Sequence, residues 1–264
     1  MVGYDLPGLV CVRRINDGFA RDETFLALQV HGGGEVAARV YAHKVLDGRD
    51  QRRFETEIAA LQVLADEPHI LTPVAAGVTD AGHAYVATAY CVAGSLHDHL
   101  IAVGRFTPAE VRRIGAKLAD ALGQAHTQGV FHRNIKPANI LITGAGEPAL
   151  SDFGLVALET ADGDYAPPLT PTQRAYAAPE AFLPELMSAA ADIYSLGATM
   201  YALLAGWAPR ASDPFAIAID GDTLVDLPRV PWALMTVVRR AMALDPQERF
   251  ADAFELRNAL TAIT

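Results

Sequence analysis

The chain has few of the residues that mark secreted, membrane-spanning or metal-stabilised proteins. It contains only two cysteines in 264 residues, Cys11 and Cys91, too few for a disulfide framework. No paired Cys/His spacing suggests a zinc site. No apolar run approaches the ~18 residues needed to cross a bilayer, and the N-terminus lacks the basic region of a signal peptide. These absences predict a protein of the reducing cytoplasm, with no membrane contact from this segment.

Positive charge is also in short supply. Lys and Arg total 21 against 31 Asp and Glu, which gives a formal net charge of −10. Such a chain repels nucleic acid and anionic membranes, so we expect neither as a main partner. Apolar residues, in contrast, make up 51% of the chain, enough for the core of one large domain or two modest lobes.

Sequence patterns divide the chain into two parts. In the first part we expect a turn at 31–34, a helix around 54–64, and strands at 24–30, 36–46, 71–76 and 84–89. After residue 93 the pattern becomes helical, and Thr107-Pro108-Ala109-Glu110 is a capping box with proline at the first helical position. Later helices are expected at 193–203, ending at Gly206, and near 232–243 and 251–263. The sequence predicts an α+β fold, with a small β-rich part followed by a larger helical part.

A short hairpin is predicted within the helical part. Residues 140–142 and 149–151 are apolar segments on either side of a turn-rich loop. If residue 142 faces residue 149, then Asn139 faces Asp152 at the base of the hairpin. A carboxamide oxygen and a carboxylate suit Mg²⁺. By itself this pair is weak evidence, because polar residues flank most hairpins.

The motifs around this hairpin resemble those of protein kinases. His132-Arg133-Asn134-Ile135-Lys136-Pro137-Ala138-Asn139 precedes the hairpin and Asp152-Phe153-Gly154 follows it. Ala178-Pro179-Glu180, Asp192 with Gly197, and Arg249 come later, in the family's order. The resemblance covers nearly the whole chain, and Lys136-Pro137-Ala138-Asn139 is typical of bacterial eukaryotic-like Ser/Thr kinases. It implies one bilobal domain over 1–264, with an N-lobe at about 1–88, a hinge at about 89–92 and a C-lobe at about 93–264.

The resemblance also implies a nucleotide site. Strand period places Ala42 and Lys44 on one face, so that the first can cover an adenine while the second reaches phosphates. The family places the lysine's partner at Glu57. Its remaining implied positions are Gly18 in the glycine-rich loop, the gatekeeper Thr88, the hinge from Ala89 to Cys91, and Leu141 beneath the base.

In the helical part the resemblance assigns chemistry and architecture to different residues. Position 134 and Lys136 are the catalytic positions, and Asn139 and Asp152 are the implied magnesium ligands. Four further matches have architectural roles in the family: Arg133, Glu180, Asp192 and Arg249. Among these, Glu180 is implied to pair with Arg249.

Three departures from the family pattern bear on activity. Kinases have an aspartate at the position that corresponds to Asn134. The neutral carboxamide of Asn134 cannot accept the proton of a substrate hydroxyl. The glycine-rich loop is reduced to Gly18, and three acidic residues, Asp17, Asp22 and Glu23, add negative charge there unless they point outward. Before Ala178-Pro179-Glu180, Thr172-Gln173 stands where many relatives have Gly-Thr.

Together these departures favour a pseudokinase that acts as a signalling scaffold with weak or conditional ATP–Mg²⁺ binding. Thr170 and Thr172 are candidate phosphosites, which would make phosphothreonine-reading domains protein partners by analogy. The family analogy also allows the chain to be the cytoplasmic domain of a longer membrane-anchored protein.

Three other functions share features with this sequence. The first alternative is an active Ser/Thr protein kinase in which Asn134 is an attenuating or engineered change. A small-molecule kinase of the aminoglycoside or choline type is opposed by Ala178-Pro179-Glu180 and Arg249. An α/β-hydrolase is excluded because the chain has no Gly-x-Ser-x-Gly elbow.

Overall fold

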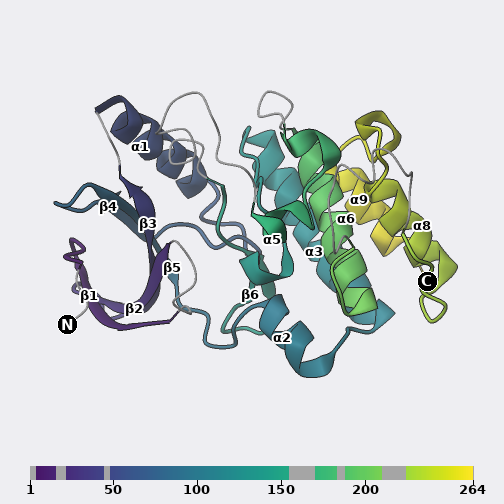
Figure 1. Cartoon of the computed structure of the whole chain (residues 1–264), viewed down its shortest axis with the longest axis horizontal. Helices are drawn as coiled ribbons and strands as arrows, with labels where there is room; N and C mark the ends of the chain where they lie inside the picture. The colour runs from purple at the N-terminus through teal and green to yellow at the C-terminus, as the bar shows by residue number, and fades with distance from the viewer. Residues whose placement is uncertain are drawn as a thin grey trace. The chain divides into compact units, whose positions relative to one another are not determined.

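The structure, a computed structural model, describes residues 4–15, 22–44, 48–154, 170–182, 188–209 and 224–263. The chain divides into two compact units (Figure 1). Unit 1 comprises residues 1–66, 71–92 and 155–167, and unit 2 comprises 67–70, 93–154 and 168–264. One division between the units falls between Val92 and Ala93.

Unit 1 is built on an antiparallel sheet of five strands in the order β1-β2-β3-β5-β4. The elements are β1 (Leu9–Arg14), β2 (Glu23–Gln29), β3 (Glu35–Lys44), α1 (Gly48–Gln62), β4 (Ala75–Val78) and β5 (His83–Ala89). The predicted turn at 31–34 is present between β2 and β3, where Gly32 and Gly33 have φ values of 100° and 67°. A residue with a Cβ would be strained in this left-handed conformation, so the two glycines permit the tight reversal.

One predicted strand is displaced. We expected a strand at 71–76, but β4 begins at Ala75. Pro73 explains the difference, because proline has no N–H to donate to the sheet. The chain joins the sheet only after it, when the N–H of Val74 bonds to the carbonyl of Ala87 at 2.8 Å.

The core of unit 1 follows the two-residue period of its strands. On β2, β3 and β5 the side chains that belong to this core lie two residues apart, and they therefore share one face of the sheet. Members of this core are Leu6, Leu9, Phe25, Ala27, Val36, Ala38, Val40, Tyr85 and Ala87.

Unit 2 is mainly helical, with one short hairpin. Its longer elements are α2 (Leu96–Val103), α3 (Pro108–Thr127), β6 (Ile140–Ile142), β7 (Pro148–Leu150), α6 (Ala189–Ala205), α8 (Trp232–Ala241) and α9 (Ala253–Thr261). The one-turn elements are η1 (Pro137–Asn139), α5 (Pro171–Arg174), η2 (Pro179–Phe182) and η4 (Pro246–Glu248). Helix α3 packs against α6 and α9, and α6 is buried along its length from Ala191 to Ala205.

The helix boundaries of unit 2 follow from local chemistry. At the start of α3 the predicted capping box is present, since Thr107 Oγ1 accepts from the N–H of Glu110 at 3.3 Å and Glu110 accepts from the N–H of Thr107 at 2.8 Å. Helix α6 ends at Gly206, as expected, with a φ of 93°. A Cβ on Gly206 would lie 2.5 Å from the carbonyl oxygen of Gly104, so only glycine fits there.

The predicted register of the β6–β7 hairpin is wrong by one residue. Residue 142 pairs with Pro148, not with residue 149, and Leu141 pairs with Ala149. Proline can occupy the first position of an edge strand because no ladder bond needs its missing N–H. The connecting loop is therefore shorter than expected, and Asn139 lies opposite Ser151, whose N–H bonds to the Asn139 carbonyl at 2.9 Å.

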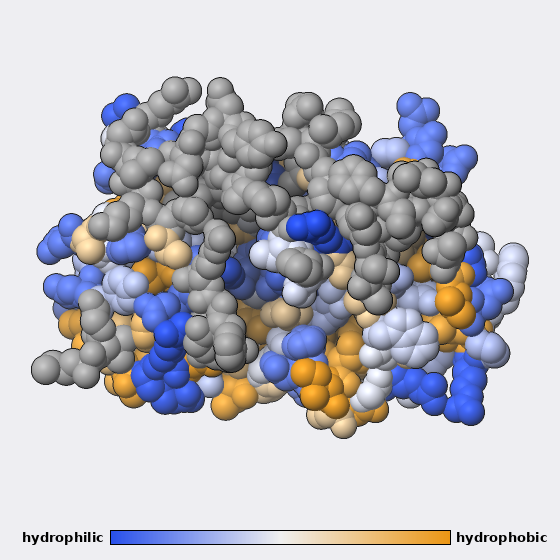
Figure 2. Space-filling model, in the orientation of Figure 1, coloured by the Kyte–Doolittle hydropathy of each residue, from blue (hydrophilic) through white to orange (hydrophobic). Residues whose placement is uncertain are grey.

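The surface mixes hydrophilic residues with small apolar patches. Figure 2 shows one such patch over α2, where Ile101 and Val103 are exposed. Small exposed apolar patches are ordinary on protein surfaces. Among the helices in the described ranges, none combines the length and hydropathy needed to cross a membrane.

Candidate active site

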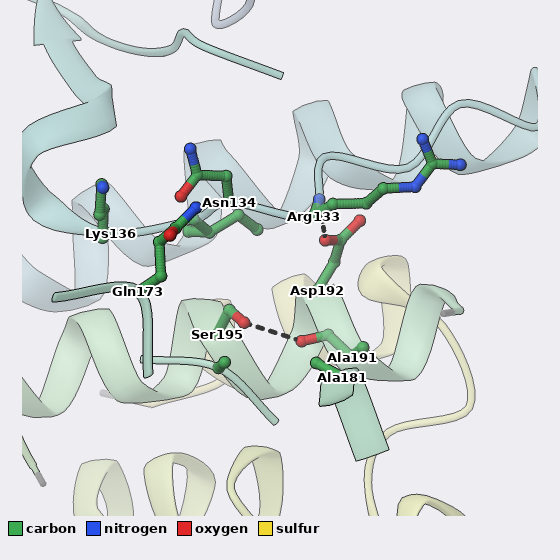
Figure 3. A pocket seen from close by; sticks show the side chains of 10 residues that line it. Arg133, Asn134, Lys136, Gln173, Ala181, Ala191, Asp192 and Ser195 are labelled. Carbon is green, nitrogen blue, oxygen red and sulfur yellow. Dashed lines mark hydrogen bonds between the residues drawn. The ribbon is translucent and has the colours of Figure 1, made fainter. Parts of the chain in front are cut away.

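The loop at 132–139 is anchored by the buried carboxylate of Asp192, in the first turn of α6. Its Oδ2 accepts from the N–H of His132 and its Oδ1 from the N–H of Arg133, each at 2.8 Å, and His126 Nε2 donates to it at 2.9 Å. Figure 3 shows the carboxylate directed at the backbone of Arg133. Burial alone would raise the pKa of Asp192, but the hydrogen bond and charge of His126 and the contacts with His132 outweigh it and lower the pKa. The anchor is therefore ionised at neutral pH.

Backbone strain marks two positions of this region. Arg133 and Asp152 have φ values of 65° and 56°, which residues with a side chain seldom adopt. Such strain persists only where neighbouring contacts impose it, and it clusters at functional sites. At Arg133, the contact that imposes it is the bond to Asp192.

His132 connects the loop to the residues that follow the hairpin. Its side chain is fully buried and stacks on Phe153, with ring centroids 4.3 Å apart. Burial lowers the pKa of His132 from its ordinary 6.5, so the imidazole is neutral at pH 7. Neutral Nδ1 can then accept the bond from the N–H of Asn134, at 3.3 Å. The stacked ring thus helps to set the backbone at position 134.

Asn139 also fixes the backbone of Asn134, through the Asn134 carbonyl. Its Nδ2 donates to the carbonyl of Asn134 at 2.8 Å, and its own carbonyl accepts from the N–H and the hydroxyl of Ser151. Within the described ranges, the hydrogen bonds of Asn134 are made by its backbone, and none involves its carboxamide. The loop therefore fixes the backbone of Asn134 and leaves its side chain at the surface of a small pocket.

This pocket lies within unit 2 and has a cavity volume of about 30 Å³. Figure 3 shows that Asn134, Lys136 and Gln173 face it, with Arg133, Asp192 and Ser195 also in its wall. Of the pair Thr172-Gln173, which stands where many relatives have Gly-Thr, Gln173 reaches the pocket, while Thr172 is exposed. A second capping-box signature, Thr170-Pro171-Thr172-Gln173, was the signal in the sequence that could have shown this.

An ion pair ties the stretch after the pocket to the C-terminal helices. The Arg249 guanidinium bonds both carboxylate oxygens of Glu180, at 2.5 and 2.9 Å, and also the carbonyls of Ala243 and Ala190 at 2.8 Å. The Arg249 side chain is completely buried. The pairing of Glu180 with Arg249 expected from the resemblance is therefore present.

A comparison with known protein families identifies the family to which this arrangement belongs. The sequence model described as "Protein kinase domain" matches residues 21–251. The chain belongs to the protein kinase domain family. Kinase domains of this family use ATP and Mg²⁺ and act on proteins.

Several curated relatives are mycobacterial serine/threonine kinases. Serine/threonine-protein kinase PknK of Mycobacterium tuberculosis is 36% identical over 227 residues, which cover 81% of this chain and 20% of PknK. PknJ of the same organism is 35% identical over 230 residues, covering 82% of this chain and 38% of PknJ. This kinase domain thus spans between a fifth and two fifths of the length of these relatives.

Solved structures agree with the fold. The crystal structure of the M. tuberculosis PknI kinase domain superposes with a TM-score of 0.75 at 27% identity, covering 97% of this chain and 95% of that chain. The C20A mutant of the same kinase domain gives a TM-score of 0.73. The expected α+β kinase fold, with an antiparallel sheet followed by a helical region, is confirmed.

Two residues of unit 2 carry oxygen atoms of the kind that Mg²⁺ prefers. Because the Asn139 Nδ2 is bonded to the carbonyl of Asn134, its Oδ1 remains for a cation, and Asp152 follows Ser151, which is bonded to Asn139. Within the described ranges, no cluster of three or more Asp, Glu, His or Cys could hold a metal. A pair of this kind fits Mg²⁺, which keeps several waters and is completed by the phosphates of a nucleotide.

The expected nucleotide residues are distributed over both units, and each unit is described separately. In unit 1, Ala42 lies on β3, Lys44 is the last residue of β3, Glu57 is half-buried on α1, and Ala89 ends β5. Cys91 follows the sheet and is buried, which raises the pKa of its thiol. In unit 2, Leu141 lies on β6. Gly18 and the Lys44 side chain lie outside the described residues.

Two acids near the expected phosphate loop are engaged in ion pairs. Asp22 bonds to Arg39 at 2.7 Å and also accepts from the N–H of Ala42 at 3.0 Å. Glu23 lies 2.6 Å from Arg14. Their charge is therefore largely neutralised by neighbouring strands, so the repulsion of a triphosphate expected from the sequence is weaker for these two residues.

Proposed function

We propose that this kinase domain is catalytically impaired and serves as a signalling scaffold. The observation that carries the proposal is Asn134, at the position where kinases keep a base. An amide cannot take the proton of a hydroxyl substrate at neutral pH, and loss of a general base lowers the rate by ~10²–10⁴. Slow residual transfer is compatible with the proposal, since positioning and Mg²⁺ carry much of phosphoryl transfer.

The retained architecture supports a role in binding. Asp192 and His132 still hold the loop, and Arg249 still holds Glu180, although position 134 has lost its charge. We assign Lys136 to phosphate contact, Asn139 and Asp152 to Mg²⁺, and Lys44 with Glu57 to the nucleotide. Ala42, Ala89, Cys91, Leu141 and Gly18 complete the proposed nucleotide site.

A transfer assay tests the impairment directly. Purified protein incubated with labelled ATP and Mg²⁺ should phosphorylate itself or a generic protein substrate at below about 1% of the rate of an active kinase domain run in parallel. The Asp152→Ala variant, purified identically, reports contaminating kinases. Transfer at an ordinary kinase rate that disappears in Asp152→Ala would overturn the proposal in favour of an active Ser/Thr protein kinase, which the retained Lys136, Asn139 and Asp152 support.

Nucleotide binding should be weak and dependent on Mg²⁺. A ligand at about ten times its Kd stabilises the native state by about 1.4 kcal/mol. For a domain of this size that corresponds to a rise in Tm of about 3–6 °C. We expect such a rise only at millimolar ATP with Mg²⁺, and no rise in the Asp152→Asn variant. An unchanged Tm for the unmodified protein at millimolar ATP would show a scaffold that binds no nucleotide.

Protein partners are proposed from the segment before Glu180. Thr172 is exposed on α5, and Thr170 is exposed beside it. Phosphorylation of either by another kinase would create a site for phosphothreonine-reading domains. A cytoplasmic location, either alone or as the cytoplasmic part of a membrane-anchored protein, is consistent with this role.

A further inference from the structure

Gln173 is held in place by both its backbone and its side chain. Its Oε1 accepts from the N–H and the hydroxyl of Thr170, at 2.8 and 2.9 Å, and its N–H donates to Thr170 Oγ1 at 3.3 Å. Its carbonyl accepts from the N–H groups of Tyr176 and Ala177. These bonds form a reciprocal capping box, and the side chain of Gln173 also faces the pocket.

The pocket that Gln173 faces also contains the side chain of Asn134. Figure 3 shows the two carboxamides pointing toward each other, with Lys136 alongside. The cavity that they line together with other residues has a volume of about 30 Å³, which has room for a water molecule or two. A serine or threonine side chain that approached Asn134 through this cavity would meet the Gln173 side chain, which lines it.

We propose that Gln173 plugs the acceptor side of position 134 and is a second determinant of the impairment. The inference rests on the proposed function, because it takes position 134 as the point that a substrate hydroxyl approaches. A shorter residue at 173 would not extend to the side chain of Asn134. The Gln173 amide also carries two N–H donors, so even a carboxylate introduced at 134 would be drawn into a charge-assisted hydrogen bond with it.

A thiol introduced at position 134 measures the plug without nucleotide or phosphoryl transfer. In the Asn134→Cys protein, the rate of alkylation at position 134 by iodoacetamide is followed by mass spectrometry of the peptide. Adding Gln173→Thr should raise this rate about tenfold, because the plug is held by two neutral hydrogen bonds to its Oε1. Thr172→Ala, on the same turn of helix, is the matched control and should leave the rate unchanged.

Two further measurements separate local opening from unfolding. Thr170→Val removes the hydroxyl that holds Gln173 but keeps Gln173 itself, and should give a smaller increase in the alkylation rate. The buried thiol of Cys91 is an internal monitor, since its alkylation rises only if the protein unfolds more widely. The inference is overturned if Gln173→Thr leaves alkylation at 134 unchanged, or raises it only in step with Cys91.

The two hypotheses fail in different experiments. An unchanged alkylation rate would contradict the proposal that Gln173 plugs the site, but it would not contradict the impairment by Asn134. Robust phosphoryl transfer by the unmodified protein would contradict the proposed impairment, whatever the alkylation rates are.

Discussion

Replacing Asn134 by Asp and Gln173 by Thr in the same chain is expected to raise phosphoryl transfer by ~10²–10⁴ over the unmodified protein. The first change restores a group that can take the proton of the substrate hydroxyl, and the second gives that hydroxyl access to it. The loop needs no other repair, because Asp192, His132 and Asn139 already fix the backbone at position 134. Autophosphorylation and transfer to a protein substrate, both with labelled ATP, are the measurements.

The single variants show how the two positions share the effect. Asn134→Asp alone should gain less than the double variant, and Gln173→Thr alone should gain nothing, since it supplies no base. Asp152→Ala added to the double variant should abolish the gain. If Asn134→Asp alone recovers the whole rate, Gln173 does not restrict the site. If the double variant stays silent, the glycine-poor stretch at 15–23 is sufficient to prevent transfer.

Replacing Arg249 by Ala should lower the free energy of unfolding by about 3–5 kcal/mol. The guanidinium is fully buried, and its removal leaves the Glu180 carboxylate without its partner in a poorly solvated place. The carbonyls of Ala243 and Ala190 lose a donor at the same time. Urea unfolding followed by far-ultraviolet circular dichroism gives the change.

The matched control is another arginine of the same unit. Arg257 pairs with Asp120, but both side chains are more than a third exposed, so Arg257→Ala should lower the stability by about 1 kcal/mol or less. The Glu180→Gln variant, combined with Arg249→Ala, completes a double-mutant cycle for the buried pair. Equal losses for Arg249→Ala and Arg257→Ala would show that the Glu180 pair does not hold the two segments together.

Features that depend on a few consecutive residues were predictable. Thr107 and Glu110 cap α3 whatever surrounds them, and two glycines permit the reversal between β2 and β3. The start of β4 at Ala75 also has a local cause, because Pro73 has no N–H to donate to the sheet.

Features that depend on pairing between segments were predicted less well. The hairpin register was wrong because the sequence allowed either residue 148 or 149 opposite residue 142, and the fit of Pro148 at the strand start decided between them. The acids Asp22 and Glu23 were expected to add negative charge near a triphosphate unless they point outward, and the sequence did not show their ion pairs with Arg39 and Arg14. Such partners are set by sheet pairing, which a linear pattern does not show.

By itself, the sequence determined the family and the loss of a base at position 134, because each of these depends on the identity of residues in a fixed order. Only the tertiary structure decided which side chain stands opposite that position. Residues 134 and 173 are far apart along the chain, and they meet because Asp192 holds one segment while the Thr170 capping box orients the other. Hydrogen bonds with such directional demands act only once the chain has brought their partners together.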